Sequence, residues 1–410
     1  MKKTWLLGFG FFSISLTWAL YNAFVPFFLE PYLKNAAMIG FMMTIDNYFA
    51  MFLQPWIGRR SDRTDTRFGR RMPYLLFGMP LAALFVALVP FHTGFLTLIL
   101  FLVLMNLSMS IYRSPVIALM PDITPEAKRT RANGVINFMG GIGAIMAFGG
   151  GSMLYQADRS LPFLAAAAVT LVSLFIVFRF IKERTSQVSS EGLAKASGDQ
   201  ADGLLRSQSF RSELNRTTVM LLAAVFFWFI SYQGVEAFFT LYGKNHLGLD
   251  EAAASFSLTF FSLFFVLFAI PSGMLGSRFG KKNVIVAGVC GLFLVFAAVS
   301  FVQSLVMLRL LLALGGIFWA CININSYPLV VATGRESSIG TRTGLYYLVS
   351  SLAAIVSPPL LGQIIDWFGY AALFYCASGG LVLALMMLLQ IRGQAERPAD
   401  NRLSPQAAQS

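Results

Sequence analysis

The sequence predicts an all-α membrane protein with about twelve transmembrane helices, arranged as two pseudo-symmetric bundles of six. Three observations support this fold class. Of the 410 residues, 57% are hydrophobic and only 12% are charged, whereas about a quarter of the residues in a typical soluble domain are charged. The apolar residues form separate runs of about 20, each long enough as a helix to cross the hydrocarbon core of a bilayer. A single long hydrophilic stretch divides these runs into two equal sets.

Each apolar run is interpreted as one helix, because backbone polar groups in lipid must be satisfied within the spanning segment itself. The first run is interpreted as a spanning helix and not as a cleaved signal peptide, since it continues to Leu29 without a small-residue cleavage site. The expected spans are residues 5–29, 38–60, 73–92, 95–121, 131–156, 161–181, 217–242, 252–277, 283–302, 304–331, 341–366 and 370–392.

The hydrophilic stretch at residues 182–216 is rich in Ser, Gly, Gln and charges of both signs, which predicts a flexible linker. It separates an N-terminal six-helix bundle at residues 1–181 from a C-terminal six-helix bundle at residues 217–392. A hydrophilic tail follows at residues 393–410.

Basic residues gather in alternate loops, and this pattern predicts the orientation, because cytoplasmic loops retain Lys and Arg. We therefore expect a multi-pass inner-membrane protein whose two termini and linker are cytoplasmic. The net charge of +12 comes from short clusters between apolar runs and does not predict a nucleic-acid partner. The expected inner side carries Arg59, Arg60, Arg63, Arg67, Arg70, Arg71, Lys128, Arg129, Arg131, Arg278, Lys281, Lys282, Arg335 and Arg342, and the outer side carries Lys34, Arg159 and Lys244.

The sequence gives no indication of a metal or a cofactor. Cys290, Cys321 and Cys376 lie inside apolar runs without metal-ligand spacing, and His92 and His246 fall in expected outer loops. No Gly-x-x-x-x-Gly-Lys-Ser/Thr loop is present, which disfavours a pump driven by ATP. An intramembrane enzyme would need clustered His, Cys or paired acids near one surface, so we expect no enzyme and assign no catalytic residue.

The two halves carry matching motifs at a nearly constant offset, as expected of a fold built from internal repeats. Three matches in the same order are unlikely to arise by chance. The matched positions are Gly58-x-x-x-Asp62-Arg63 with Gly69-Arg70-Arg71 and Gly273-x-x-x-Ser277-Arg278 with Gly280-Lys281-Lys282, then Pro115 and Pro328 with the loops Arg131-Ala132-Asn133-Gly134 and Thr341-Arg342-Thr343-Gly344, and finally Asp158 and Asp366.

Six plus six helices, a central linker and a Gly-x-x-x-Asp-Arg…Gly-Arg-Arg loop after the second span together resemble the major facilitator superfamily. The stretch from Gln54 to Pro73, which contains Ser-Asp-Arg and Arg-Phe-Gly-Arg-Arg, is similar to the sucrose:proton symporters within the glycoside-pentoside-hexuronide:cation symporter grouping. One position departs from that branch. Plant members have an Asp in the fourth helix where this chain has Asn106, so another carboxylate must carry any proton coupling.

This resemblance implies a secondary active transporter that moves a glucoside or disaccharide together with H+ or Na+ by alternating access, and of these two cations we expect H+. A drug or metabolite exporter, working as a proton antiporter on the same fold, stays open as the alternative. The glycine-rich fifth span lacks the proline that is typical of such exporters. We expect a monomer surrounded by membrane lipid, with a small sugar and a cation as its partners.

In a facilitator-like fold the first helix of each three-helix unit lines the central cavity, which here means the first, fourth, seventh and tenth spans. Residues four apart share a helical face, so Trp18 lies over Asn22 and Trp319 over Asn323. A ring beside an amide suits a sugar, although interhelical packing is the structural alternative. The candidate substrate-binding residues are Trp18, Asn22, Asn106, Arg113, Trp228, Tyr232, Gln233, Trp319, Asn323 and Asn325.

Asp46 and Glu236 place carboxylates within expected spans, where a charged group costs about 2.5 to 3.5 kcal/mol at the helix centre by insertion scales. Our hypothesis is that Asp46 or Glu236 binds the coupling cation and that Arg113 pairs with a carboxylate or a sugar hydroxyl. Two structural alternatives stay open. Asp46 could pair with a polar side chain of a neighbouring helix, and Arg113 could extend toward the cytoplasmic surface.

The basic loop after the second span predicts a mechanical role. Asp62 can accept hydrogen bonds from nearby arginines and from the amide end of an adjoining helix, and so latch helix ends together. Ser277 replaces the acid in the second half, which predicts a weaker latch there. A purely topogenic role of the arginines is the alternative. The candidate latch residues are Asp62, Arg63, Gly69, Arg70 and Arg71.

Overall fold

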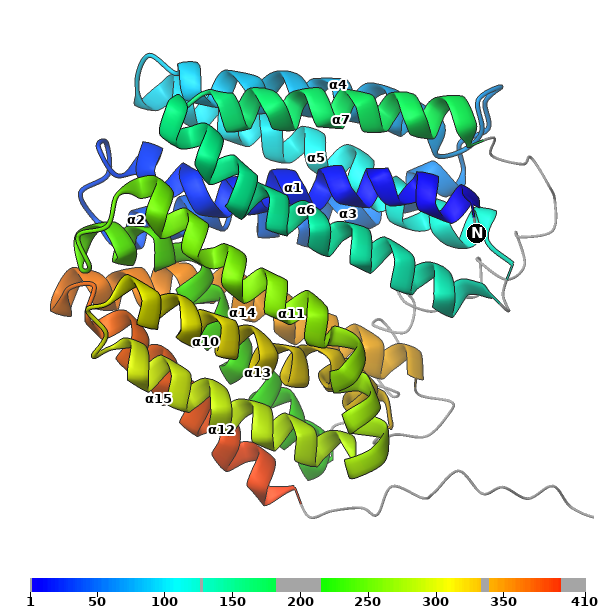
Figure 1. The fold of residues 1–410 in the computed structure, drawn as a ribbon. Helices are drawn as coiled ribbons and strands as arrows, with labels where there is room; N and C mark the ends of the chain where they lie inside the picture. The colour runs from blue at the N-terminus through cyan, green and yellow to red at the C-terminus, as the bar shows by residue number, and fades with distance from the viewer. Residues whose placement is uncertain (1, 126–127, 182–214, 333–338, 392–410) are drawn as a thin grey trace, which may run out of the picture.

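The computed structural model describes residues 2–125, 128–181, 215–332 and 339–391, and all the regular structure in these ranges is helical. Within these ranges twelve stretches of helix are long and apolar enough to span a membrane, which confirms the predicted fold class. Figure 1 shows the helices in two groups, with α1 to α7 in the upper one and α10 to α15 in the lower one.

The helix bounds follow the expected spans closely, with differences of a few residues at the ends. In the N-terminal half the helices are α1 (Lys2–Leu29), α2 (Ala36–Met43), α3 (Ile45–Asp62), α4 (Met72–Leu88), the short 3-10 helix η1 (Val89–Phe91), α5 (Phe95–Ile123), α6 (Arg129–Ala157) and α7 (Leu161–Phe180). In the C-terminal half they are α10 (Arg216–Asn245), α11 (Glu251–Phe279), α12 (Lys281–Val299), α13 (Leu305–Ala332), α14 (Ile339–Phe368) and α15 (Ala372–Gln390).

Some predictions fall outside the described residues. The predicted linker lies outside them except for its last two residues, of which Arg216 begins α10. The predicted tail and Arg335 also lie outside them, as does the side chain of Arg131. The division of the chain at residues 182–216 therefore stays a prediction.

The second expected span is not one continuous helix, because it breaks at Thr44. The backbone N–H of Thr44 ends α2 by donating to the carbonyls of Phe41 and Met42. The carbonyl of Thr44 then accepts from Asn47 and Tyr48 as α3 begins. The break therefore starts a new helix in the middle of the span.

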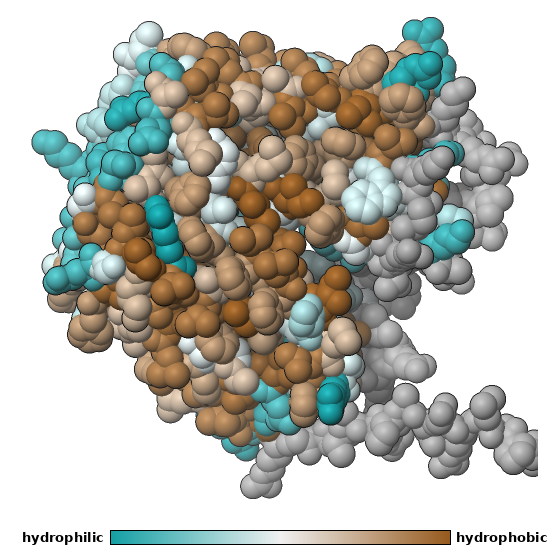
Figure 2. Space-filling model, in the orientation of Figure 1, coloured by the Kyte–Doolittle hydropathy of each residue, from teal (hydrophilic) through white to brown (hydrophobic). Residues whose placement is uncertain are grey.

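The helical bundle has two ends that differ in their loops. The arginine end holds the loop between α3 and α4, and the opposite end holds the loop between α1 and α2. In Figure 1 the labelled N-terminus lies at the arginine end, on the right. The surface between the ends is largely apolar, and hydrophilic residues gather toward the left and right margins in Figure 2. Exposed side chains such as Leu96, Ile270 and Met274 fit contact with lipid.

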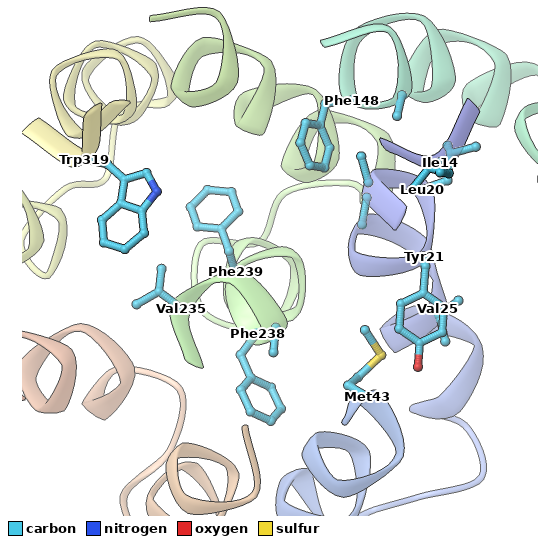
Figure 3. Close-up of a cluster of buried hydrophobic side chains, with 14 of the residues drawn as sticks. Ile14, Leu20, Tyr21, Val25, Met43, Phe148, Val235, Phe238, Phe239 and Trp319 are labelled. Carbon is cyan, nitrogen blue, oxygen red and sulfur yellow. The ribbon is translucent and has the colours of Figure 1, made fainter. Parts of the chain in front are cut away.

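The two halves meet mainly along three helix pairs, which are α1 with α10, α2 with α14, and α6 with α11. Apolar side chains from both halves fill much of this interface. Figure 3 shows Leu20, Tyr21 and Val25 of α1 on one side and Phe238 and Phe239 of α10 on the other. A polar cavity interrupts this apolar packing.

Candidate binding cavity

A cavity of about 210 Å³ lies between the two halves, and most of its lining side chains are polar. Six helices of the N-terminal and C-terminal halves form its wall around the α1–α10 contact. The lining residues are Trp18 and Asn22 of α1, Met43 of α2, Asp46 and Asn47 of α3, Arg113 of α5, Gln233, Glu236 and Ala237 of α10, and Ala354 and Pro358 of α14.

Trp18 and Asn22 reach the cavity together because they lie four residues apart on one face of α1. The ring of Trp18 faces Arg113, whose guanidinium carbon lies 5.6 Å from the ring centroid. This is within the range of a cation–π contact, which also orients the guanidinium. An aromatic face and a planar set of N–H donors thus lie side by side at the wall.

Asn22 and Glu236 connect the two halves directly across the cavity. The Asn22 Nδ2 donates to Glu236 Oε1 at 3.2 Å. Glu236 reaches this position from α10, and Gln233 lies one turn earlier on the same helix and faces the same space. A change in the charge or the partner of Glu236 therefore acts at the contact between the halves.

Asp46 and Asn47 enter the cavity because the break at Thr44 puts both in the first turn of α3. Asn47 Nδ2 donates to Asp46 Oδ1 at 3.0 Å. Among the described residues neither Asp46 nor Arg113 has an ion-pair partner within 4.0 Å. One acid and one guanidinium thus face the same cavity, and both have capacity for a polar ligand.

An aromatic stack lies beside the cavity in the C-terminal half. The rings of Tyr232 and Trp319 are parallel within 6°, with their centroids 3.9 Å apart. Tyr232 precedes Glu236 by one turn of α10, so this stack lies next to the lining residues without being part of the wall. Trp228, one turn before Tyr232 on α10, is fully buried.

Three of the predicted amides lie away from the wall. Asn106 is fully buried in α5. Asn325 donates to the carbonyl and hydroxyl oxygens of Ser272, each at 3.2 Å, and to the carbonyl of Cys321 at 3.0 Å, so its amide joins α13 to α11. Asn323 is half-buried and its carbonyl accepts from the Ser326 hydroxyl.

The structure therefore brings six of the twelve predicted substrate and cation residues to the cavity wall: Trp18, Asn22, Asp46, Arg113, Gln233 and Glu236. It does not bring Asn106, Trp228, Tyr232, Trp319, Asn323 or Asn325 to the wall. Sequence reasoning missed Met43, Asn47, Ala237, Ala354 and Pro358. Asn47 could have been recognised in the sequence, because it is an amide next to Asp46 within an apolar span. Small and apolar residues have no such feature that distinguishes a cavity position.

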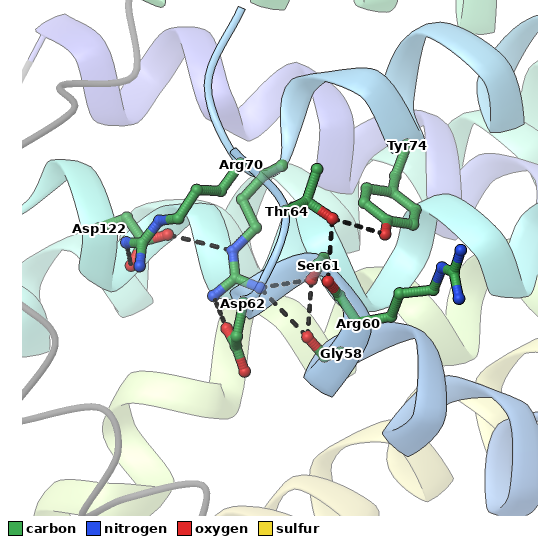
Figure 4. A network of polar contacts seen from close by, with 9 residues as sticks. Gly58, Arg60, Ser61, Asp62, Thr64, Arg70, Tyr74 and Asp122 are labelled. Atoms are coloured by element: carbon green, nitrogen blue, oxygen red, sulfur yellow. Dashed lines mark hydrogen bonds and ion pairs between the residues drawn. The ribbon is translucent and has the colours of Figure 1, made fainter. Parts of the chain in front are cut away.

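Arg71 is the centre of the polar network at the arginine end. Figure 4 labels its partners Ser61, Asp62 and Asp122. Its side chain is 1% exposed, and it forms an ion pair with Asp62 and donates from Nε to Asp122 Oδ2 at 3.1 Å. It also bonds the Ser61 hydroxyl and the carbonyl of Gly58. These partners join the end of α3, the start of α4 and the end of α5 within one half.

The other predicted latch residues contribute in different ways. Arg70 lies 3.7 Å from Asp122, an acid that sequence reasoning did not include. Gly69 has φ of 107°, a left-handed conformation that favours glycine. Arg63 ends α3 through its backbone, and its side chain is exposed. In the second half the Ser277 hydroxyl donates only within its own helix, to the Met274 carbonyl at 2.8 Å.

A second network joins the two halves at the opposite end. Lys244 of α10 lies 2.8 Å from Glu30, which follows α1, and 3.0 Å from Glu251 of α11. Glu251 also accepts from the Tyr155 hydroxyl at 2.7 Å and pairs with Arg159 at 3.3 Å. The halves are therefore held together by charges at this end.

Asp158 illustrates the difference between these networks and an exposed acid. It lies between α6 and α7 and accepts from the backbone N–H and the hydroxyl of Ser160, at 2.7 and 2.5 Å. These hydrogen bonds lower the pKa of Asp158 below its usual value. Asp158 is far from the cavity wall and provides a matched control for its acids.

Comparisons with known proteins agree with this architecture. The family model for the Major Facilitator Superfamily matches residues 7–257 and 244–409. The tetracycline resistance protein, class B, of Escherichia coli is 22% identical over 385 residues, which is 91% of this chain and 92% of that protein. The isoprimeverose transporter of Lactiplantibacillus pentosus is 24% identical over 295 residues, 68% of this chain and 59% of that protein.

Solved structures of transporters share the fold. The nucleoside transporter NupG superposes with a TM-score of 0.75 at 14% identity, covering 95% of this chain and all of that chain. A bacterial homologue of the human lysosomal transporter Spinster, solved in an inward-facing and occupied conformation, gives a TM-score of 0.69 at 14% identity over 94% and 93% of the two chains. At these identities the likeness concerns the fold alone.

Proposed function

The chain belongs to the Major Facilitator Superfamily, and from that premise we propose that it is a sugar:cation symporter. Its substrate is a glucoside or disaccharide, its coupling ion is H+, and the two halves alternate access to the cavity between them. The protein acts as a monomer in the inner membrane, with the arginine end and both termini in the cytoplasm. No chemical change of the substrate is involved.

The observation that carries this proposal is the composition of the cavity wall. A guanidinium, three amides and an indole face the same space, and such groups can hold the hydroxyl edge and the C–H face of a sugar. In this proposal Trp18 contacts the sugar ring, while Arg113 and Gln233 bond its hydroxyls. A sugar that touches both halves is held most tightly when they close around it, as alternating access requires.

The two carboxylates provide the coupling. Asp46 and Glu236 lie in opposite halves and line one cavity. A carboxylate within a bilayer that lacks an ion-pair partner is stabilised by binding a proton or a cation. We assign Glu236 as the first candidate for the coupled proton, because its bond with Asn22 links its state to the contact between the halves.

Export of a drug or metabolite by proton antiport is the second candidate function. It is favoured by one observation, namely that the similarity to the class B tetracycline resistance protein extends over 91% of this chain. The two functions differ in the direction in which substrate moves when a proton gradient is imposed. A transport measurement with defined gradients therefore separates them.

The test is uptake of a panel of labelled glucosides and disaccharides into proteoliposomes with an imposed pH or Na+ gradient. At least one sugar is expected to accumulate when the outside is acidic. Glu236→Gln and Asp46→Asn are expected to abolish accumulation and to retain exchange of sugar between the two sides. Asp158→Asn, the matched control, is expected to accumulate sugar normally.

Each alternative result has a defined meaning. If no sugar binds or is transported, and a drug or metabolite is instead moved in the direction opposite to the proton flow, the exporter function replaces this proposal. If a sugar accumulates equally well with both cavity acids neutralised, the coupling assignment to Asp46 and Glu236 is wrong.

A further inference from the structure

Arg309 is a charged residue within a membrane span, and it belongs neither to the cavity wall nor to the networks at the two ends. It lies four residues after Leu305, the first residue of α13, which is about 6 Å along the helix. α13 has 28 residues. A centred helix of this length extends about 6 Å beyond the hydrocarbon core on each side. Arg309 therefore lies near the boundary between the hydrocarbon and the lipid headgroups at the opposite end.

The side chain of Arg309 lies on the neighbouring helix α11. Its Nε donates a long hydrogen bond to the Ser257 hydroxyl at 3.5 Å. Its guanidinium carbon lies 5.1 Å from the ring centroid of Phe256 and 5.7 Å from that of Phe260. Both distances are within the range of a cation–π contact. Two rings and a hydroxyl thus hold the guanidinium in one position.

The side chain does not extend toward the end of the helix, as a long basic side chain near a membrane surface often does. α11 and α13 run in parallel from the opposite end, and Asn325 of α13 bonds Ser272, 53 positions earlier on α11. The same offset puts Arg309 level with Phe256. The guanidinium contacts Phe256 and Phe260, so it stays at the depth of its own backbone or slightly deeper. At this depth a charge needs a compensating group.

The protein itself supplies no such group in the part that the structure describes. No carboxylate there lies within 4.0 Å of Arg309. Two other bases at the same end, Arg159 and Lys244, both pair with Glu251. Arg309 therefore differs from its neighbours in having a fixed position without an acid.

The position of Arg309 is open to lipid. Phe256 and Phe260 begin a stripe on α11 whose members recur every three or four residues, and its later members are exposed apolar side chains, which fit contact with lipid. These later members are Leu263, Leu267, Ile270 and Met274. On α13 the exposed side chains of Val306 and Leu310 flank Arg309. The guanidinium thus lies where a lipid molecule can touch both helices.

We propose that Arg309 binds the phosphate of a phospholipid in the leaflet at the opposite end. Its two Nη groups have no hydrogen-bond partner among the described residues, and their fork matches two phosphate oxygens. The rings of Phe256 and Phe260 orient the fork, and the acyl chains lie along Val306 and Leu310. One lipid then provides the counter-charge and contacts α11 and α13 together. This inference depends neither on the substrate nor on the direction of transport.

The test measures the binding of single lipids to the purified full-length protein by native mass spectrometry. The protein is freed of co-purified lipid in detergent and titrated with dioleoyl phosphatidylglycerol, and the dissociation constant of the first bound lipid is measured. Dioleoylglycerol, which has the same acyl chains but no phosphate, is titrated in parallel. Inorganic phosphate is added in a competition experiment.

Removing the guanidinium is expected to weaken the site. Arg309→Gln should raise the dissociation constant of the first phosphatidylglycerol at least about tenfold, the factor of one hydrogen bond to a charged group. Lys34→Gln is the matched control, because Lys34 is an exposed base at the same end, and it should bind as the parent protein does. If Arg309→Gln binds phosphatidylglycerol as tightly as this control, the site is overturned.

The two other ligands identify what is bound. Dioleoylglycerol should bind to the parent protein at least about tenfold more weakly than phosphatidylglycerol. Inorganic phosphate should not displace the lipid, because it lacks the chains that contact Val306 and Leu310. Equal binding of dioleoylglycerol would overturn the role of the phosphate. Displacement by inorganic phosphate would overturn the lipid as the occupant, because the site would then take a free anion.

A variant of the aromatic wall keeps the charge and tests the site separately. Phe256→Leu removes one ring and should weaken binding about two- to fivefold, the factor of a cation–π contact at an exposed site. Phe301→Leu is its control, since Phe301 is exposed at the same end, between α12 and α13. Equal binding by these two variants overturns the assignment of the rings, and with it the site where Arg309→Gln does not give a monodisperse protein.

Discussion

Replacing Arg71 by leucine is expected to destabilise the arginine end strongly. The guanidinium is 1% exposed and bonds two carboxylates, a hydroxyl and a carbonyl. Among the described residues, its loss leaves Asp122, which is 4% exposed, with only the more distant Arg70 at 3.7 Å. Removing one partner of a buried ion pair costs about 3 to 5 kcal/mol. Asp62 is 31% exposed and can be hydrated, so we expect a loss near 3 kcal/mol.

The measurement is thermal unfolding of the purified protein in detergent. Spread over 410 residues, a loss of about 3 kcal/mol lowers Tm by about 3 to 4 °C, at ~2.1 cal/mol/K of unfolding entropy per residue. Arg59→Leu is the control, because Arg59 is exposed in the same segment and should change stability by less than about 0.5 kcal/mol.

A double variant tests the reason for the loss. Arg71→Leu combined with Asp122→Asn no longer buries an unpaired charge and should recover part of the lost Tm. If the Tm of Arg71→Leu lies within about 1 °C of that of Arg59→Leu, the buried-pair argument is refuted. It is also refuted if the double variant is less stable than Arg71→Leu alone.

Three other changes have expected outcomes. Lys244→Met removes the cation shared by Glu30 and Glu251. It should speed the reaction of a cysteine at the cavity wall, Ala237→Cys, with a membrane-impermeant maleimide applied at the opposite end about fivefold, since a partly exposed pair contributes about 1 kcal/mol. Asn325→Ala removes two hydrogen bonds between α13 and α11 and one within α13, and should cost about 1 to 3 kcal/mol, read as a lower Tm. Trp319→Ala removes the partner of Tyr232 and should cost about 3 to 5 kcal/mol, read in the same way.

Each of these three has an opposing result. Unchanged labelling in Lys244→Met would show that the charges at the opposite end do not hold the halves together. An Asn325→Ala protein with unchanged Tm would contradict a role of this amide in helix packing. Asn325 would then again be a candidate substrate-binding residue. A Trp319→Ala protein that keeps its Tm but binds sugar more weakly would give the stack a ligand-binding role.

The spans could be predicted from the sequence because hydrophobic length alone determines them. The break at Thr44 could not, because the surrounding residues contain no Gly or Pro at the break and the apolar pattern continues through it. It is the packing of α2 on α14 that divides this span. Tertiary contacts of this kind leave no local signal.

The charged part of the cavity was also predictable, since a charge within a span needs a reason. Asp46, Arg113 and Glu236 were found on that basis alone. The contribution of α14 was not predictable, because Ala354 and Pro358 resemble any residues of an apolar helix. Amides were ambiguous, since Asn22 faces the cavity whereas Asn325 joins two helices.

The packing of α2 on α14 means that the two sequence repeats do not coincide with the two groups of packed helices. If the chain were divided at the predicted linker, each piece would contain one sequence repeat. The N-terminal piece would lack α14, the surface against which α2 packs. By their packing contacts, residues 36–43 belong with the C-terminal half. The boundary between these two sets of contacts therefore crosses a single span at Thr44, two residues before the cavity acid Asp46.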